Sequence, residues 1–298
     1  MRCYTTKENR NKREKMAQPI DGKIISNQIK EELKVKVSKL KEEGKTPCLA
    51  VIQVGNDPAS SVYVNSKKKT CEQLGIESLS YELGENTTQE ELIEVIHDLN
   101  GKEQVNGILV QLPLPNHIDE DLIIRTIDPD KDVDGFHPMN VGRLWIGERG
   151  FLSCTPAGVM QLLKRSNISI EGKHCVIIGR SNIVGKPMAA LLIRENGTVT
   201  ITHSRTKNLK EVTRTADILI VAIGKKQFVT SDFIKEGAVV IDVGIHRDEN
   251  NKLCGDVDYD DVVGKASAIT PVPGGVGPMT IAMLMNNCVE AVNEVSPL

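Results

Sequence analysis

The sequence predicts an α/β protein of two domains, each built on a mostly parallel sheet, with a Rossmann-type dinucleotide-binding domain as the second. Its 298 residues suffice for about two separate cores. Short apolar segments alternate with amphipathic ones in two series, a pattern typical of doubly wound sheets. A glycine turn between strand and helix, "VIIGRSNIVGKP", opens the second series. These observations together indicate the fold class.

Composition excludes several functions. A net charge of −3 provides no basic field for nucleic acid, and only 3% aromatic residues argues against base stacking. No apolar run approaches the ~20 residues that span a bilayer. The seven cysteines are scattered without a CxxC pair, which favours neither a disulfide framework nor a zinc site. We therefore expect a cytoplasmic protein without a metal.

The first residues, "MRCYTTKENRNKREK", are polar and mostly basic. They lack the apolar core of a secretory signal, and Glu8 and Glu14 interrupt any transit-peptide pattern. We expect residues 1–16 to be a disordered extension, with Met16 as an alternative start.

The first alternating series begins with a helix from Ile24, whose apolar stripe runs through residues 25, 29, 33, 37 and 40 and stops at Gly44. A buried strand, a helix and a second strand follow. The next helix opens with a Thr88/Glu91 capping box. The expected ranges are strands at 47–55, 76–83 and 107–115 and a helix at 58–74.

The second series follows a loop at 128–150 and a helix near 157–165. Its strands are expected at 174–179, 198–203, 216–224, 238–244 and 267–270. The final helix, from Met279, carries an apolar stripe and could pack against either domain.

The stretch "SSVYVNSKKK" places Ser60, Tyr63 and Lys67 on one face of a helix. Taken alone, this is either a catalytic Tyr–Lys pair or the polar side of an ordinary helix, and charge runs are usually solvated. YxxxK also marks short-chain dehydrogenases. In that class the nucleotide turn precedes the YxxxK helix, whereas here it lies far downstream, so that reading fails.

The glycine turn predicts a dinucleotide site. Gly179 makes the tight turn, Gly185 permits close backbone approach, and Pro187 suits an early helical position. We expect the pyrophosphate at the N-terminus of the helix that follows. The GxSxxxG spacing is not GxGxxG, so the strand–turn–helix context carries the prediction.

The end of the next strand favours NADP over NAD. An NAD site needs a carboxylate for the ribose 2′-hydroxyl, and "THSRT" has none there. Arg205, Ser204 and Arg180 offer cations and a hydroxyl that suit a 2′-phosphate; the alternative is that these arginines only face water. The predicted cofactor-binding residues are Gly179, Arg180, Ser181, Ile183, Val184, Gly185, Pro187, Ser204, Arg205 and Thr206.

Three further stretches suggest a substrate site. "VQLPLP" places Gln111 at a strand's carboxyl end, where open α/β sheets bind ligands. "DPDKDVDGFHP" is an Asp-rich loop, usually a solvated turn, and it lacks the glycine and glutamate of an EF-hand. "TPVPGGVGPMT" is a stiff loop whose glycines allow close backbone approach.

The motifs "SSVYVNSK", "VQLPLP", "KDVDGFHPMNVGRL", "GRSNIVGKP" and "PVPGGVGPMT" closely resemble those of the bifunctional methylenetetrahydrofolate dehydrogenase/methenyltetrahydrofolate cyclohydrolase. The resemblance runs from about Ala17 to Val295, in order. It implies oxidation of 5,10-methylenetetrahydrofolate with NADP and then hydrolysis to 10-formyltetrahydrofolate. It also implies a catalytic domain of 17–153 completed by the last helix (279–298), an NADP domain of 154–278, and a homodimer.

By the same resemblance Tyr63, Lys67, Gln111 and Asp134 line a folate cleft and act in catalysis, and the PGGVGP loop helps to close it. We expect Lys67 to move a proton during hydrolysis and Gln111 to orient it. Asp128, Asp130 and Asp132 receive no role. The predicted substrate-binding residues are Ser60, Tyr63, Gln111, Asp134, Pro273, Gly274, Gly275, Val276, Gly277 and Pro278.

Two alternatives stay open at this point. Another NADP-dependent dehydrogenase on the same two-domain plan would turn over a small carbonyl acid without folate. A non-catalytic NADP- or folate-binding protein would bind its ligand without hydride transfer.

Overall fold

The computed structural model describes residues 16–292 and, of these, all side chains except those of Pro58 and Ala59. Of the predicted extension at 1–16, residues 1–15 lie outside that part. The chain divides into two compact units, which differ in the number of strands in their parallel sheets. Within the described residues, the three-stranded unit holds 26–154 and 280–292, and the six-stranded unit holds 16–25 and 155–279.

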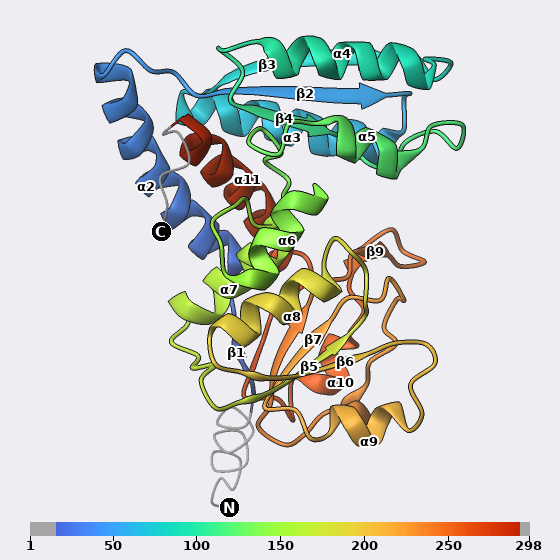
Figure 1. Ribbon diagram of the computed structural model, residues 1–298. Coiled ribbons are helices and arrows are strands. Elements are labelled where there is room, and N and C mark those ends of the chain that lie inside the picture. Colours follow the sequence, from blue (N-terminus) through green and yellow to red (C-terminus); the bar gives the residue numbers. More distant parts are fainter. Residues whose placement is uncertain (1–15, 293–298) are drawn as a thin grey trace, which may run out of the picture. The chain divides into compact units, whose positions relative to one another are not determined.

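The three-stranded unit is built around β2 (Cys48–Val54), which is buried along its whole length (Figure 1). Parallel neighbours flank it on both sides, β3 (Glu77–Leu83) and β4 (Gly107–Val110). A central strand of a parallel sheet is covered on both faces, which explains its continuous apolar sequence. Its helices are most of α2 (Gly22–Glu42), α3 (Pro58–Leu74), α4 (Gln89–Gly101), α5 (Glu120–Thr126), α6 (Pro138–Ile146) and most of α11 (Val276–Val292).

Local sequence signals account for several of these boundaries. The predicted capping box is confirmed: the Thr88 hydroxyl accepts from Glu91 N–H, and the Glu91 carboxylate accepts from Thr88 N–H. The expected strand at 107–115 is too long, because β4 ends at Val110 and the chain then enters a segment with prolines at 113 and 115 that cannot donate to a ladder. Gln111 still pairs, its N–H donating to Ile52 C=O over 2.8 Å.

The six-stranded unit has the strand order β1-β11-β8-β7-β5-β6, all pairs being parallel. β5 (His174–Ile178) lies between β6 (Thr198–Thr202) and β7 (Ile218–Val221), so the strand order reverses there. That reversal is the switch point of a Rossmann-type sheet, where ligands bind at the carboxyl ends of the strands. The remaining strands of the sheet are β8 (Val239–Asp242), β11 (Ala268–Ile269) and β1 (Gln18–Pro19).

Helices α7 (Cys154–Arg165), α8 (Gly185–Arg194), α9 (Leu209–Thr213) and α10 (Tyr259–Val262), with the 3-10 turn Ser231–Phe233, complete the unit (Figure 1). α8 packs on β5 and β6. A short antiparallel pair joins β9 (His246–Arg247) to β10 (Leu253–Cys254). The core contains Val176, Leu219 and Val240, each fully buried.

Two boundaries differ from those expected. Residues 17–25 were expected with the first domain, but they lie in the six-stranded unit, where β1 pairs with β11 at the sheet edge. The final helix begins at Val276 rather than Met279. Pro278 is compatible with the first helical turn, because its missing N–H would have no partner there.

Candidate functional site

The centre of the candidate site is a hydrogen bond between Lys67 and Gln111 in the three-stranded unit. Lys67 Nζ, on α3, donates to Gln111 Oε1 over 3.0 Å. The Gln111 amide is oriented by its other end, because Nε2 donates to Leu112 C=O over 2.7 Å. Both side chains are half-buried. The predicted helix face and the predicted strand end therefore meet.

Asp134 lies close enough to Lys67 for their charges to interact. Burial lowers the pKa of the Lys67 ammonium, and the Asp134 charge opposes that change. Burial also raises the pKa of Asp134, again opposed by its partner's charge. Within residues 16–292 the Asp134 carboxylate accepts no hydrogen bond, so its oxygens can accept from a ligand. A lysine whose pKa is lowered, beside an open carboxylate, suits proton transfer and N–H recognition.

The turn that carries Asp134 is held by Asp132, to which the sequence analysis gives no role. Asp132 is 2% exposed, and its Oδ2 accepts from His137 N–H at 2.7 Å and Asn140 Nδ2 at 2.9 Å. Burial raises the pKa of Asp132 to about 7, although these donors oppose the change. Gly135 N–H closes the turn onto Asp132 C=O over 3.0 Å. Asp132 thus positions Asp134 without itself facing solvent.

The C-terminal helix supports the same turn. Asn287 Nδ2 donates to Val133 C=O at 2.9 Å and to Leu152 C=O at 3.0 Å. The Cys154 thiol donates to the same Val133 carbonyl over 3.3 Å. Gly135 has φ of +71°, and a Cβ there would lie 2.6 Å from the Leu152 carbonyl carbon. The turn is therefore packed from several sides within its own unit.

Ser60 and Tyr63 share the helix with Lys67 but have different surroundings. Ser60 is 5% exposed, and its N–H donates to Asp57 Oδ2 over 2.7 Å at the start of α3. Tyr63 is 39% exposed. An exposed ring near Lys67 can stack on a ligand, but the binding roles of both residues stay predictions.

The nucleotide turn lies in the six-stranded unit, directly after β5. Gly179 has φ of +127°, and a Cβ on it would overlap the carbonyl oxygen of Ala222 after β7. A Cβ on Gly185 would overlap the Gly179 carbonyl in the same way. Side chains are thus excluded where the loops after β5 and β7 meet at the switch point. This backbone cradle fits a dinucleotide.

The N-terminus of α8 is partly capped by Ser181. The Ser181 hydroxyl accepts from the N–H groups of Val184 at 3.2 Å and Gly185 at 3.3 Å. Two of the donors that the sequence analysis assigns to pyrophosphate are therefore already satisfied. Pro187 is buried, whereas Arg180 and Ile183 are exposed beside the turn.

The segment after β6 also presents the predicted side chains. Ser204 and Arg205 are exposed, and Thr206 Oγ1 accepts from His203 N–H over 2.9 Å. His203 Nδ1 accepts in turn from Arg205 N–H over 3.1 Å. The backbone is fixed by these two contacts, and within the described chain neither the Arg180 nor the Arg205 guanidinium has an ion-pair partner. Both remain open to an anion.

The predicted loop 273–278 packs closely against the start of α2 within the six-stranded unit. Gly274 and Gly275 are buried, and a Cβ on Gly22 would overlap the Gly275 carbonyl oxygen. Gly274 C=O accepts from Lys23 N–H over 3.1 Å. Val276, Gly277 and Pro278 form the first turn of α11, and Pro273 is exposed. The predicted contact of this loop with folate stays a prediction.

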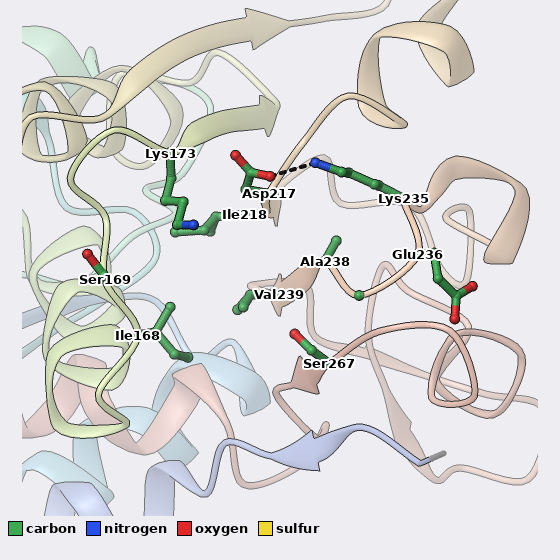
Figure 2. A pocket seen from close by; sticks show the side chains of 11 residues that line it. Ile168, Ser169, Lys173, Asp217, Ile218, Lys235, Glu236, Ala238, Val239 and Ser267 are labelled. Atoms are coloured by element: carbon green, nitrogen blue, oxygen red, sulfur yellow. Dashed lines mark hydrogen bonds and ion pairs between the residues drawn. The ribbon is translucent and has the colours of Figure 1, made fainter. Parts of the chain in front are cut away.

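A cavity of about 310 Å³ lies in the same unit, at the amino ends of the strands and so on the side of the sheet away from the glycine cradle. Figure 2 shows Lys235 reaching to Asp217, an ion pair of 2.6 Å at the cavity wall. Its lining residues precede or begin β5, β7, β8 and β11, so it lies at the amino ends of these strands. Ligands of such sheets bind at the carboxyl ends, and this cavity is not the nucleotide site.

The six-stranded parallel sheet with a glycine cradle at its switch point defines a dinucleotide-binding α/β protein. Two family models match. One is the catalytic domain of tetrahydrofolate dehydrogenase/cyclohydrolase, over residues 20–134, and the other is the NAD(P)-binding domain of the same family, over 153–296. The chain belongs to the tetrahydrofolate dehydrogenase/cyclohydrolase family.

Individual relatives support the same family assignment. The bifunctional protein FolD of Lachnoclostridium phytofermentans is 72% identical over 94% of this chain and 99% of its own. The structure of the bifunctional FolD enzyme from Campylobacter jejuni is 56% identical, with a TM-score of 0.92 over 93% of this chain and 99% of its own. A Trypanosoma brucei FolD structure, complexed with NADP cofactor and inhibitor, is 39% identical with a TM-score of 0.89, over 93% and 98% of the two chains.

Sequence reasoning missed the buried carboxylates at 132, 242 and 256. Each accepts backbone N–H groups, but only Asp242 ends an apolar strand. The position of Asp242 at the carboxyl end of the strand in "VVIDVG" is the signal that could have identified one of them.

Proposed function

We propose that this protein oxidises 5,10-methylenetetrahydrofolate with NADP and then hydrolyses the methenyl product to 10-formyltetrahydrofolate. The family assignment supports the reaction class. The Lys67–Gln111 hydrogen bond beside the open Asp134 carboxylate is the observation that carries the hydrolytic half.

The three-stranded unit is proposed to hold the folate. Asp134 accepts hydrogen bonds from N–H groups at the pterin edge, and the exposed Tyr63 packs on the pterin ring. Ser60 and the loop 273–278 are proposed to complete folate binding. The oxidation itself needs orientation more than acid or base, because the neighbouring nitrogen lone pair forms the iminium as hydride departs.

Hydrolysis of the methenyl cation needs a proton acceptor. Water adds to the bridging carbon and Lys67 takes one of its two protons. The bond from that carbon to one ring nitrogen then breaks as the remaining hydroxyl releases its proton to solvent and becomes the formyl C=O. Lys67 then returns the proton to the departing nitrogen. Burial supports this role, because it lowers the pKa of Lys67 and makes the neutral amine accessible. Gln111 holds the amine in place.

The six-stranded unit is proposed to hold NADP. When bound, NADP supplies the acceptor for the hydride. The cradle at Gly179 and Gly185 receives the backbone of the dinucleotide, and Arg180, Ser204 and Arg205 face the 2′-phosphate. Ile183, Val184, Pro187 and Thr206 shape the same turn, and Ser181 fixes it by its two accepted hydrogen bonds.

The setting of the protein is part of the proposal. We infer a cytoplasmic homodimer that binds no nucleic acid, on the family resemblance and the net charge of −3. No helix in residues 16–292 is long and apolar enough to cross a membrane. Sedimentation at micromolar concentration tests the dimer, and a monomer would contradict it.

Separate half-reactions test the proposed activity. Absorbance of reduced NADP follows oxidation of methylenetetrahydrofolate, and loss of the methenyl absorbance follows hydrolysis. Both are expected in the wild-type protein. Absence of both would remove the folate assignment, and turnover of a small carbonyl acid without folate would favour a different dehydrogenase on this plan.

A further inference from the structure

Two buried aspartates lie together at the carboxyl edge of the six-stranded sheet. Asp242 ends β8 and is 3% exposed, and Asp256 follows β10 and is fully buried. Asp256 Oδ2 accepts from Ile223 N–H at 2.8 Å and Gly224 N–H at 3.0 Å. Its Oδ1 accepts from Lys225 N–H at 2.8 Å and lies 2.7 Å from His246 Nε2. One carboxylate thus takes up three consecutive peptide N–H groups.

Asp242 fixes Asp256 in turn. Asp242 Oδ1 accepts from Asp256 N–H at 3.0 Å and from Gly244 N–H at 2.9 Å, and Oδ2 accepts from Val257 N–H at 2.9 Å. A Cβ on Gly244 would overlap the Asp256 carboxylate, and one on Gly255 would overlap that of Asp242. The space for both carboxylates is therefore built by glycines.

The segment held by Asp256 borders the nucleotide cradle. Ala222 directly precedes it, and the Ala222 carbonyl oxygen faces Gly179 across the switch point. Residues 224–228 are exposed, so this segment can meet a ligand. Free peptide N–H groups at such an edge would attract phosphate. Asp256 has already bound three of these N–H groups, and Phe228 N–H already uses the Lys225 carbonyl over 3.3 Å, so the carbonyl oxygens of Ile223 and Gly224 are the groups of this segment left for a ligand.

We propose that Asp256 is a positioning residue of the nucleotide site, which shapes segment 222–225 and gives it hydrogen-bond acceptors for a donor group of the dinucleotide. Asp256 does not touch the cofactor. The proposal rests on the proposed function, because it assumes that the cradle at Gly179 binds NADP.

Asp256→Asn tests this role, because the amide keeps the shape but replaces one acceptor oxygen with a donor that faces peptide N–H groups. Calorimetry without folate is expected to show NADP binding about 10- to 100-fold weaker, the range for one lost charge-assisted hydrogen bond. Methenyl hydrolysis, which uses no NADP, is expected to stay within about twofold of wild type, as for any residue outside the proton-transfer site. Asp260→Asn, an exposed carboxylate in α10, is the matched control.

Amide hydrogen exchange of the wild-type protein tests the proposal without any variant. Residues 223–225 are expected to be protected before NADP is added and equally protected afterwards, because their N–H groups already have a partner. Protection that arises only with NADP would overturn the proposal, as would unchanged NADP affinity in Asp256→Asn. Failure of the wild type itself to bind NADP would instead remove the proposed function, and the positioning role with it.

Discussion

Lys67 and Gln111 meet through a 3.0 Å hydrogen bond, although 44 residues separate them in the chain. One lies on α3 and the other directly after β4, so the bond forms only when the parallel sheet brings the strand end beside the helix. As a result, Lys67 is partly buried, bonded to the Gln111 amide and close to the Asp134 carboxylate.

Burial lowers the pKa of Lys67, and the charge at Asp134 opposes that change. Removing that charge in Asp134→Asn takes away the interaction that raises the pKa of Lys67, so the pKa should fall further below its usual value. Gln111→Glu adds a negative charge and should raise it. Nitrogen NMR titration measures the pKa of Lys67 in both variants without folate. If the two substitutions moved this pKa in the same direction, Lys67 would not interact with these two side chains as described.

Asp132 should make stability depend on pH. Its folded-state pKa is raised from 3.8 to about 7, so between these values the folded protein keeps a proton that the unfolded chain has lost. The free energy of unfolding should therefore fall as pH rises through this window, by about 1.4 kcal/mol per pH unit for this group. Urea denaturation of wild type and Asp132→Asn, compared from pH 4.5 to 8, isolates the effect. Parallel curves would mean that Asp132 is ionised in the folded state.

Arg205 should select NADP over NAD. Arg205→Ala is expected to raise the KM for NADP by about 10- to 100-fold, because one charge-assisted contact to a phosphate is lost, and to leave the KM for NAD unchanged. Lys207→Ala, another exposed cation nearby, is the control. Equal losses for both cofactors would show that the side chain does not contact the 2′-phosphate.

Gly179 should tolerate no side chain. Gly179→Ala places a methyl group against the Ala222 carbonyl at φ of +127°. We expect a loss of roughly 1–3 kcal/mol in stability from backbone strain, together with loss of NADP binding. Gly264→Ala, where a Cβ meets nothing within 4 Å, is the control for both measurements. Tight NADP binding by Gly179→Ala would place the cofactor elsewhere.

Local patterns were sufficient for much of the fold. The 17 residues of α3 and the Thr88–Glu91 capping box follow from spacing within one helix, and both are found as expected. The length of β4 was overestimated, because apolar residues continue into a proline-rich turn. β1 was missed, since two residues at Gln18–Pro19 become a strand only by pairing with residues 268–269.

For the candidate site, too, some residues could be predicted from the sequence and others could not. Lys67, Gln111 and Asp134 could be named because family motifs mark them, whereas the contacts that hold Asp134 were hidden. Asp256 contacts N–H groups 31–33 residues away, and Asn287 contacts a carbonyl 154 residues away. Such partners depend on tertiary packing, which no local pattern encodes.

Lys67→Met tests the central claim most directly, with the neighbouring Lys68→Met as control, because Lys68 forms an exposed ion pair with Glu82. NADP reduction and methenyl hydrolysis are followed separately for each protein. We predict that Lys67→Met loses hydrolysis by about 100-fold or more, the range for a lost general base, while hydride transfer remains measurable and Lys68→Met resembles wild type. Survival of hydrolysis in Lys67→Met would contradict the assignment of Lys67 as the group that moves the proton.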